Sequence, residues 1–365
     1  MFRLLVSAGG TGGGVYPALA VVRALAGRAD VTWVGGRGGM EAGLVTRAAI
    51  PFEEIPAAGV HGVGWAALPG NLIRLVRGYF AARRVLRRHR PQAILFTGGY
   101  VGVPVALAAR NVPKLAFVPD LEPGLALRSI GRVADVIALT ADETQAFFPS
   151  ARRTVVTGYP VRPDLQPVER GEARARLNLH PRDEVLLVMG GSRGARAINE
   201  ALWACLEKVL QFAEVVHLTG ELDFPRVEAI RQKLPPRAAE RYHAFAYLHA
   251  TEISWALSAA NLALSRAGAS ILGEYPLFGL PAVLIPYPHT WRYQYRNAMY
   301  LVNHGAALVL RERDLPERLS ETALELLNDR PRLSRMAEKA RALYVPGAAQ
   351  AIASELENLA RTWSA

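Results

Sequence analysis

Residues 3–14 read RLLVSAGGTGGG, a mostly apolar run that ends in a glycine-rich turn. Pro17 follows where the first turn of a helix tolerates a missing N–H group. An apolar run, a glycine loop and a helical pattern are typical of the strand–loop–helix unit of a parallel α/β sheet. The N–H groups of such a loop and the dipole of the helix favour an anion. This stretch therefore predicts a parallel sheet with an anion-binding loop at its edge.

The same alternation continues through the first half of the chain. We expect further strands over residues 31–34, 93–96, 114–118 and 135–139. The helical patterns between them cover residues 40–49, 72–89 and 103–109. Strands that alternate with helices predict a parallel sheet covered by helices on both faces.

A second unit of this kind follows residues 157–163, TGYPVRP, where turn-forming residues mark a domain boundary. An apolar run at 185–189 enters the glycine loop GGSRGA at 190–195, and a helical pattern covers 196–212. Further strands are expected over residues 215–218, 262–265 and 282–286. We therefore predict an α/β protein with two Rossmann-like domains, residues 1–163 and 164–345, whose parallel sheets face each other across a ligand-binding cleft.

The end of the chain carries an amphipathic pattern at about residues 346–365. Such a pattern predicts a helix that buries its apolar stripe against other elements. We expect this helix to pack back on one of the two domains, in our interpretation the first.

Composition agrees with two cores and separates the two halves by charge. The chain has 365 residues, of which 51% are hydrophobic, and a net charge of +11. Residues 1–163 hold 19 Lys/Arg and 9 Asp/Glu, whereas the remaining residues are nearly balanced. This asymmetry predicts an anionic partner for the first half: nucleic acid, a membrane surface or a phosphorylated substrate.

Several classes of protein are disfavoured by the sequence. Cys205 is the single cysteine, which excludes an intramolecular disulfide, and no signal peptide or spanning segment is evident, so we expect a cytoplasmic protein. Neither glycine loop contains G-x-x-x-x-G-K-[ST], and Val15 takes the last glycine place of G-x-G-x-x-G. ATP hydrolysis and nicotinamide binding are therefore disfavoured.

Two further features of the first half bear on its anionic partner. A third glycine turn at residues 97–102 follows another strand, which suggests two phosphate-bearing ligands, one for each half. Within residues 72–89, one helical face carries arginines and the opposite face carries apolar residues. The arginines are Arg74, Arg77, Arg84 and Arg88, and the apolar residues are Leu72, Leu75, Tyr79 and Leu86.

The basic helix has two interpretations, an ordinary solvated surface or an attraction to anionic lipids. Residues 60–69, just before it, supply apolar side chains that suit insertion into lipid. No aromatic-studded basic strand or recognition-helix motif accompanies the arginines, so nucleic acid is the least attractive partner.

Six motifs, in this order, resemble the MurG family of GT-B glycosyltransferases. They are GGTGG at 9–13, TGGYV at 97–101, GYPVR at 158–162, GGSRGA at 190–195, SRAGA at 265–269 and QYRNA at 294–298. The resemblance implies transfer of N-acetylglucosamine, with inversion, from UDP-N-acetylglucosamine to lipid I, the undecaprenyl-diphosphate-linked acceptor, to form lipid II for peptidoglycan. It also implies a peripheral protein on the cytoplasmic face of the cell membrane, with the anionic lipid surface as partner and no nucleic acid.

The resemblance also implies roles for individual residues. Ser192 and its neighbours, with Arg162, would hold the donor diphosphate, Glu274 the ribose, Leu248 the uracil, and Gln294 with Asn297 the sugar. The implied donor-binding residues are Thr11, Gly12, Gly13, Asp120, Arg162, Ser192, Arg193, Gly194, Leu248, Ala269, Ser270, Ile271, Leu272, Gly273, Glu274, Gln294 and Asn297. The implied acceptor-binding residues are Gly10, Thr11, Gly12, Gly13, Gly98, Gly99 and Tyr100.

The chain departs from the family where a catalytic base is expected. Gly14 stands in place of the family's histidine after the first glycine loop. Residues 117–120, FVPD, stand in place of its His-Glu-Gln-Asn segment. Asp120 is the ionisable residue left there, so we predict that Asp120 is the base, with a helix-capping or turn role as the alternative. His61, His289 and Glu122 are weaker candidates.

These departures leave two alternatives open: a GT-B transferase for another lipid or small acceptor, and a non-catalytic nucleotide-sugar-binding protein. The intact donor motifs argue against the second, because glycosyl transfer depends mainly on positioning and leaving-group stabilisation. No metal-ligand cluster or Asp-x-Asp motif is present, so we expect no cofactor and no protein-bound metal.

Overall fold

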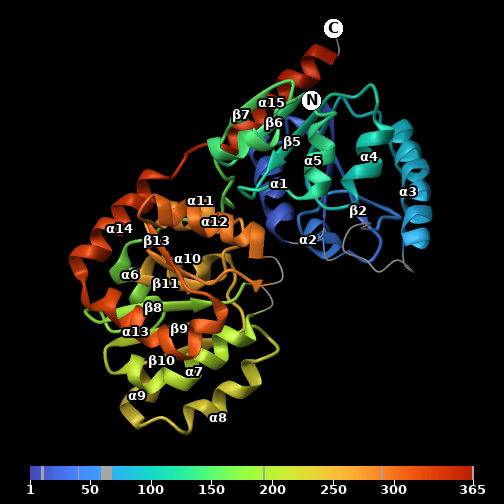
Figure 1. Ribbon diagram of the computed structural model, residues 1–365. Coiled ribbons are helices and arrows are strands. Elements are labelled where there is room, and N and C mark those ends of the chain that lie inside the picture. The colour runs from blue at the N-terminus through green and yellow to red at the C-terminus, as the bar shows by residue number, and fades with distance from the viewer. Residues whose placement is uncertain (10–11, 40, 59–67, 192–193, 289–290, 364–365) are drawn as a thin grey trace. The chain divides into compact units, whose positions relative to one another are not determined.

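The computed structural model describes residues 1–9, 12–39, 41–58, 68–191, 194–288 and 291–363 (Figure 1). The chain forms two compact units, Met1–Arg162 with Val345–Ala365, and Pro163–Tyr344. We refer to them as unit 1 and unit 2. Each contains one parallel sheet, which confirms the predicted fold class of two α/β domains.

Unit 1 has a seven-stranded sheet in the order β3-β2-β1-β4-β5-β6-β7. Its strands are β1 (Phe2–Ala8), β2 (Ala29–Gly36), β3 (Phe52–Ile55), β4 (Ala93–Gly98), β5 (Lys114–Val118), β6 (Val136–Leu139) and β7 (Thr154–Val156). Its helices are α1 (Gly12–Ala24), α2 (Glu41–Arg47), α3 (Leu68–His89), α4 (Gly102–Ala108), α5 (Leu125–Gly131), the short 3-10 helix η2 (Asp142–Phe147) and α15 (Ala348–Trp363).

Helices cover both faces of this sheet, as the continuous apolar strands require. Helices α3, α4 and α5 pack together on one face, and α1 and α15 pack together on the other (Figure 1). The side chains of β5 are all buried. The terminal helix α15 contacts α1, β4 and β5, and Glu355 on it forms two 2.7 Å hydrogen bonds with Arg153.

Unit 2 has a six-stranded sheet in the order β10-β9-β8-β11-β12-β13. Its strands are β8 (Glu184–Met189), β9 (Ala213–Leu218), β10 (Tyr242–Phe245), β11 (Leu262–Ser265), β12 (Ala282–Leu284) and β13 (Ala307–Val309). Its helices are α6 (Arg170–Arg176), α7 (Arg196–Leu210), α8 (Val227–Arg231), α9 (Pro236–Glu240), α10 (Ala250–Ala259), α11 (Ile271–Phe278), α12 (Trp291–Asn303), α13 (Leu315–Asn328) and α14 (Arg330–Ala342), with short 3-10 helices η3 (Phe224–Arg226) and η5 (Glu312–Asp314).

The core of unit 2 lies between the sheet and helices α7, α13 and α14. Leu186 and Val188 of β8, Leu202 of α7 and Leu326 of α13 are fully buried in one cluster. Burial of this apolar surface is the main favourable contribution to the stability of the unit.

The strands that the sequence pattern misses are those at the edges of the two sheets. They are β3, β7, β10 and β13. Each is three or four residues long and only partly buried, so its sequence signal is weaker than that of a fully buried strand.

Candidate functional site

Three loops of unit 1 leave the same edge of the sheet, because β1, β4 and β5 are parallel neighbours. Ala8, at the end of β1, pairs with Gly98, at the end of β4. The glycine loop after β1, the turn at Gly98–Gly99 and the segment that leads to Asp120 therefore emerge together. Helix α1 begins at Gly12, directly after the first loop, and Tyr100 is 50% exposed. Gly10 and Thr11 lie outside the described residues.

The two glycine turns of unit 1 are packed against each other. Gly99 has a φ of +88°, and a Cβ atom there would lie 2.6 Å from the carbonyl oxygen of Gly9. A Cβ at Gly14 would lie 3.0 Å from the Thr97 carbonyl oxygen, and Thr97 Oγ1 donates a 2.7 Å hydrogen bond to the Gly14 carbonyl. Thr97 thus packs tightly against Gly14, and a larger residue at position 14 would have to displace the Thr97 carbonyl.

The acidic residues after β5 differ in their surroundings. Asp120 is half-buried in the bend that follows the strand. Glu122 is 2% exposed and accepts a 2.9 Å hydrogen bond from Arg128. Glu122 is thus engaged in a nearly buried ion pair with Arg128. His61 and His289, the other weaker candidates, lie outside the described residues.

Arg162, a predicted donor ligand, is the last residue of the first segment of unit 1. Its guanidinium carbon lies 4.6 Å from the ring centre of Tyr16, in the first turns of α1. This cation–π contact places a positive charge near the helix that begins at the first glycine loop.

In unit 2, the predicted donor loop joins β8 to α7. Gly194 has a φ of +77°, and a Cβ atom there would lie 2.2 Å from the carbonyl oxygen of Thr219. Only glycine permits this approach between the loop and the end of β9. Helix α7 begins two residues later, so its N-terminal N–H groups face the loop that precedes them. Ser192 and Arg193 lie outside the described residues.

The segment predicted to approach the diphosphate or the sugar, residues 269–273, lies at the start of α11, and Glu274, the predicted ribose ligand, follows it. Ala269, Ser270 and the helical residues Ile271, Leu272, Gly273 and Glu274 follow β11. Glu274 is 9% exposed, and Leu248, which precedes α10, is 4% exposed. Within α11, Glu274 is thus a nearly buried carboxylate among the buried residues Ile271, Leu272 and Tyr275.

The predicted sugar-binding amides lie on α12 and contact the loop after β11. Gln294 Oε1 accepts hydrogen bonds from the backbone N–H of Tyr287 at 2.9 Å and of Ala267 at 3.3 Å. Asn297 is fully buried and donates to the Ala267 carbonyl at 3.1 Å. Both amides thus fix the backbone of Ala267, a role that the sequence does not reveal.

Helix α3 presents a mixed basic and apolar surface. Leu72, Ile73, Val76 and Phe80 are 60%, 54%, 50% and 55% exposed, and Arg74, Arg77, Arg84 and Arg88 are exposed as well. Leu75, Tyr79 and Leu86 are half-buried, as expected for the side that faces α4. Leu72, expected opposite the arginines, instead lies on the exposed surface. The loop at 59–67 is outside the described residues.

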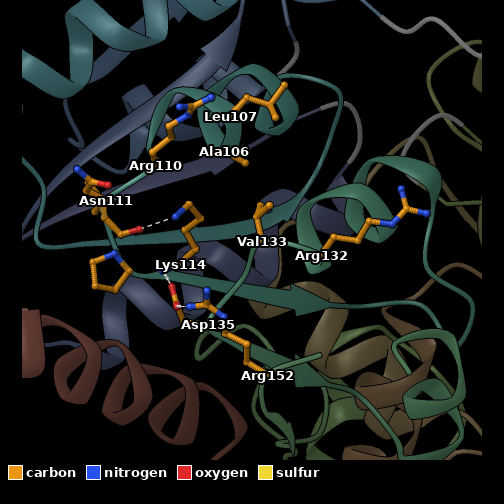
Figure 2. A pocket seen from close by; sticks show the side chains of 11 residues that line it. Ala106, Leu107, Arg110, Asn111, Lys114, Arg132, Val133, Asp135 and Arg152 are labelled. Atoms are coloured by element: carbon orange, nitrogen blue, oxygen red, sulfur yellow. Dashed lines mark hydrogen bonds and ion pairs between the residues drawn. The ribbon is translucent and has the colours of Figure 1, made fainter. Parts of the chain in front are cut away.

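A cationic pocket lies at the opposite edge of the unit 1 sheet, where β5, β6 and β7 begin (Figure 2). Its volume is about 620 Å³. Arg110, Lys114, Arg132 and Arg152 line it with one carboxylate, Asp135, which accepts hydrogen bonds from the Lys114 N–H and from Arg152 (Figure 2). Burial lowers the pKa of Lys114, whose Nζ donates to the Val112 carbonyl.

This pocket has no counterpart among the sequence motifs. Its basic residues come from separate turns and strand starts, so no local spacing marks them. Leu107 and Val133, also in its lining, are 56% and 41% exposed. Exposed apolar side chains beside cations are typical of a surface that meets anionic lipid.

Comparison with known proteins places the whole chain in one family. The glycosyltransferase family 28 N-terminal domain matches residues 4–119, and the family 28 C-terminal domain matches residues 185–352. A UDP-N-acetylglucosamine–N-acetylmuramyl-(pentapeptide) pyrophosphoryl-undecaprenol N-acetylglucosamine transferase of Roseiflexus sp. (strain RS-1) is 42% identical, over 98% of this chain and 95% of its own. The crystal structure of Acinetobacter baumannii MurG superimposes with a TM-score of 0.79 at 28% identity and covers 98% of this chain. The chain belongs to the MurG family.

A second MurG relative shows how evenly the similarity is spread. The transferase of the same name from Actinobacillus pleuropneumoniae serotype 5b (strain L20) is 36% identical over 96% of this chain and 97% of its own length. The Acinetobacter MurG chain is covered completely. The MurG resemblance found in the six motifs is therefore confirmed over both units.

None of the helices in the described ranges is both long and apolar enough to cross a membrane. In the same part of the chain, no three His, Cys, Asp or Glu side chains gather in a way that would hold a metal ion.

Proposed function

We propose that this protein transfers N-acetylglucosamine from UDP-N-acetylglucosamine to the muramoyl 4-hydroxyl of lipid I and so forms lipid II. The observation that carries this function is the full-length similarity to transferases of that name, which includes the glycine loops of both units. The protein is thus an N-acetylglucosaminyltransferase of peptidoglycan synthesis.

The reaction is a displacement at the anomeric carbon. The acceptor oxygen forms a bond to this carbon, the bond to the UDP oxygen breaks, and the configuration inverts. The proton of the acceptor hydroxyl passes to a base, and UDP leaves with the bonding electron pair. Stabilisation of the charge on UDP is the largest contribution expected from the protein.

We assign the donor to unit 2. The loop at 190–195 precedes α7, whose N-terminal N–H groups and dipole favour the diphosphate. In this proposal Glu274, which is 9% exposed, accepts hydrogen bonds from the ribose hydroxyls, and the apolar Leu248 contacts the uracil. Gln294 and Asn297 act on the sugar through Ala267, whose N–H and carbonyl they hold.

We assign the lipid diphosphate to unit 1, where the loops after β1 and β4 emerge together. Their glycines leave backbone N–H groups open to a phosphate. Asp120, on the neighbouring β5 side of the same edge, is the base in this proposal. Gly14 cannot take that role, because it has no side chain.

We further propose that unit 1 attaches the enzyme to an anionic membrane surface, on its cytoplasmic face, rather than to nucleic acid. The exposed face of α3 interleaves arginines with Leu72, Ile73, Val76 and Phe80. Helix α4 packs against α3 and leads to the cationic pocket. Each basic residue near such a surface contributes about 1 kcal/mol, and the apolar side chains add burial in lipid.

No cofactor or protein-bound metal takes part in this proposal, because the loop dipoles and arginines supply the positive potential that UDP requires. Turnover should therefore persist in excess chelator. Complete loss of turnover with EDTA, restored by Mg²⁺, would contradict this part of the proposal.

The direct test is an assay of UDP release with a soluble lipid I analogue and UDP-N-acetylglucosamine. We expect UDP and disaccharide product in equal amounts, and little UDP without the acceptor. UDP release with a different acceptor but not with lipid I would favour another GT-B activity. UDP-sugar binding without turnover on any acceptor would favour a non-catalytic protein.

A further inference from the structure

A line of buried polar side chains connects α7, β9 and β10 in unit 2. Trp203 Nε1–H donates to the Tyr242 hydroxyl at 2.9 Å, and this hydroxyl lies 2.8 Å from His217 Nδ1. His217 Nε2 lies 3.0 Å from Asn199 Oδ1. Tyr242, His217 and Asn199 are fully buried. We call these four residues the His217 relay.

Asn199 connects the relay to groups near the donor loop. Its Nδ2 donates to the Thr219 carbonyl and to Asp223 Oδ2, both at 2.9 Å. These two acceptors fix the direction of the amide, so its oxygen must face His217. Asp223 also accepts a hydrogen bond from Arg196, the first residue of α7.

The direction of every hydrogen bond in the relay follows from these contacts. The Asn199 oxygen is only an acceptor, so His217 Nε2 carries a hydrogen and donates it. Burial lowers the pKa of His217 to about 3, so the ring is neutral at physiological pH and Nδ1 has no hydrogen. Nδ1 therefore accepts from the Tyr242 hydroxyl, whose oxygen accepts from Trp203.

The relay ends where the donor loop meets the sheet. The Thr219 carbonyl that Asn199 holds is the atom against which Gly194 packs without a Cβ. Asn199 lies in the first turn of α7, and its N–H bonds to the Ala195 carbonyl at 2.9 Å. The relay thus fixes the first turn of α7 and the end of β9 together, next to Gly194.

We propose that His217 is a positioning residue for the donor diphosphate. It holds Asn199 in one orientation, and Asn199 sets the distance between the start of α7 and Thr219. The backbone at Gly194 and the N-terminal N–H groups of α7 then keep one geometry toward the diphosphate, which avoids a reorganisation cost when UDP-N-acetylglucosamine binds. This inference rests on the proposed role of the loop at 190–195 as the donor site.

The test compares His217→Leu, which removes both hydrogen bonds, with His217→Gln, whose amide can donate to Asn199 and accept from Tyr242. For His217→Leu we expect the KM for UDP-N-acetylglucosamine and the Kd for UDP to rise about tenfold, because small misplacements of binding groups are costly. The KM for the lipid I analogue should stay within about twofold of wild type, and His217→Gln should restore most of the donor affinity.

His243→Leu is the matched control. His243 lies on β10 and bonds to Glu214, which lies at the start of β9, at 3.0 Å. This change also removes a histidine and its hydrogen bond from the same sheet, but away from the loop. It should lower the melting temperature and leave the KM for the donor unchanged. An equal rise in the donor KM for both variants would overturn the proposal.

A second variant covers the case in which His217→Leu fails to fold. Tyr242→Phe removes only the hydroxyl that donates to His217, and we expect a rise of about threefold in the Kd for UDP. A folded His217→Leu or Tyr242→Phe protein with the UDP affinity of wild type would refute the relay. Failure of the wild-type protein to use lipid I, with UDP still bound, would instead count against the proposed function.

Discussion

Gly99 shows how one residue constrains the acceptor edge of unit 1. Its φ is +88°, and a Cβ atom would lie 2.6 Å from the Gly9 carbonyl oxygen. The Gly99→Ala change should therefore lower the free energy of unfolding by about 1–3 kcal/mol and weaken lipid I binding. Gly124→Ala is the control, because Gly124 has a φ of −64° and open space around it. Urea denaturation of the two variants is the measurement, and equal stability would contradict the role given to Gly99.

Asp120 carries the proposal for the catalytic base. Replacement by Asn keeps the size of the side chain but removes the proton acceptor, so turnover should fall by about 10² or more with little change in donor KM. Asp142→Asn, an exposed carboxylate on η2, is the control and should keep wild-type turnover. Near-normal turnover of Asp120→Asn with lipid I would remove Asp120 from the mechanism.

A residue of the candidate site can be recognised from the sequence only when its interaction partners are close to it in the chain. The glycine loops are recognisable because the strand, loop and helix are contiguous. Gln294 and Asn297 are recognised through their family motif, but their hydrogen-bond partner Ala267 belongs to a different segment, the loop after β11. The relay around His217 joins residues on two strands and a helix, so only the fold brings them together.

At the scale of elements, the sequence predicts the interior strands and misses the edge strands. The interior strands of both sheets are buried on both faces and are predicted from their apolar runs. The edge strands β3, β7, β10 and β13 are only three or four residues long and are partly exposed. Hydrophobic pattern alone cannot separate such strands from loops.

Helix α3 is the element that should meet the membrane. The double variant Arg74→Glu/Arg77→Glu reverses two exposed charges and should reduce binding to anionic vesicles about 30-fold or more at low salt. The defect should shrink as salt rises, because screening weakens the attraction of the wild type. Arg318→Glu/Arg335→Glu, two exposed arginines of unit 2, is the control in the same sedimentation assay. The proposed surface would be contradicted if both double variants lost vesicle binding equally, or if the α3 double variant lost none.

The end of α3 is held to β3 by a pH-dependent contact. Glu53 accepts hydrogen bonds from His89 at 3.0 Å and Arg88 at 2.9 Å, and these bonds hold the pKa of its carboxyl below the ordinary value. The stabilisation is therefore complete above the ordinary carboxyl pKa and is lost as pH falls through the lowered value.

Glu53→Gln should thus lower the free energy of unfolding by about 1 kcal/mol at neutral pH, and by less where the carboxyl is protonated. The neighbouring Glu54→Gln, at an exposed position, should have little effect at either pH. The measurement is a denaturation curve for each variant at neutral pH and in acid, where the Glu53 carboxyl is protonated. A Glu53→Gln defect that persists unchanged in acid would show that the charge is not responsible.

At the scale of the whole molecule, the chain builds two parallel-sheet units and returns to the first one. Helix α15 belongs to unit 1 although it follows unit 2 in sequence, and Arg153–Glu355 and Arg28–Glu357 ion pairs join it there. Its amphipathic pattern predicts a packed helix, but the pattern does not say which sheet receives it. The uneven charge of the two halves is similarly visible in the sequence, whereas the cationic pocket forms only when the fold brings residues 110–114, 132–135 and 152 together.

The central claim is inverting transfer of N-acetylglucosamine to lipid I, and the anomeric configuration of the product tests it most directly. The donor sugar is α-linked to UDP, so a single displacement must give a β-linked disaccharide. We predict that the purified protein, UDP-N-acetylglucosamine and a lipid I analogue yield this β-linked product, measured by the proton coupling at the new anomeric centre. An α-linked product, or no disaccharide despite bound UDP, would contradict the account.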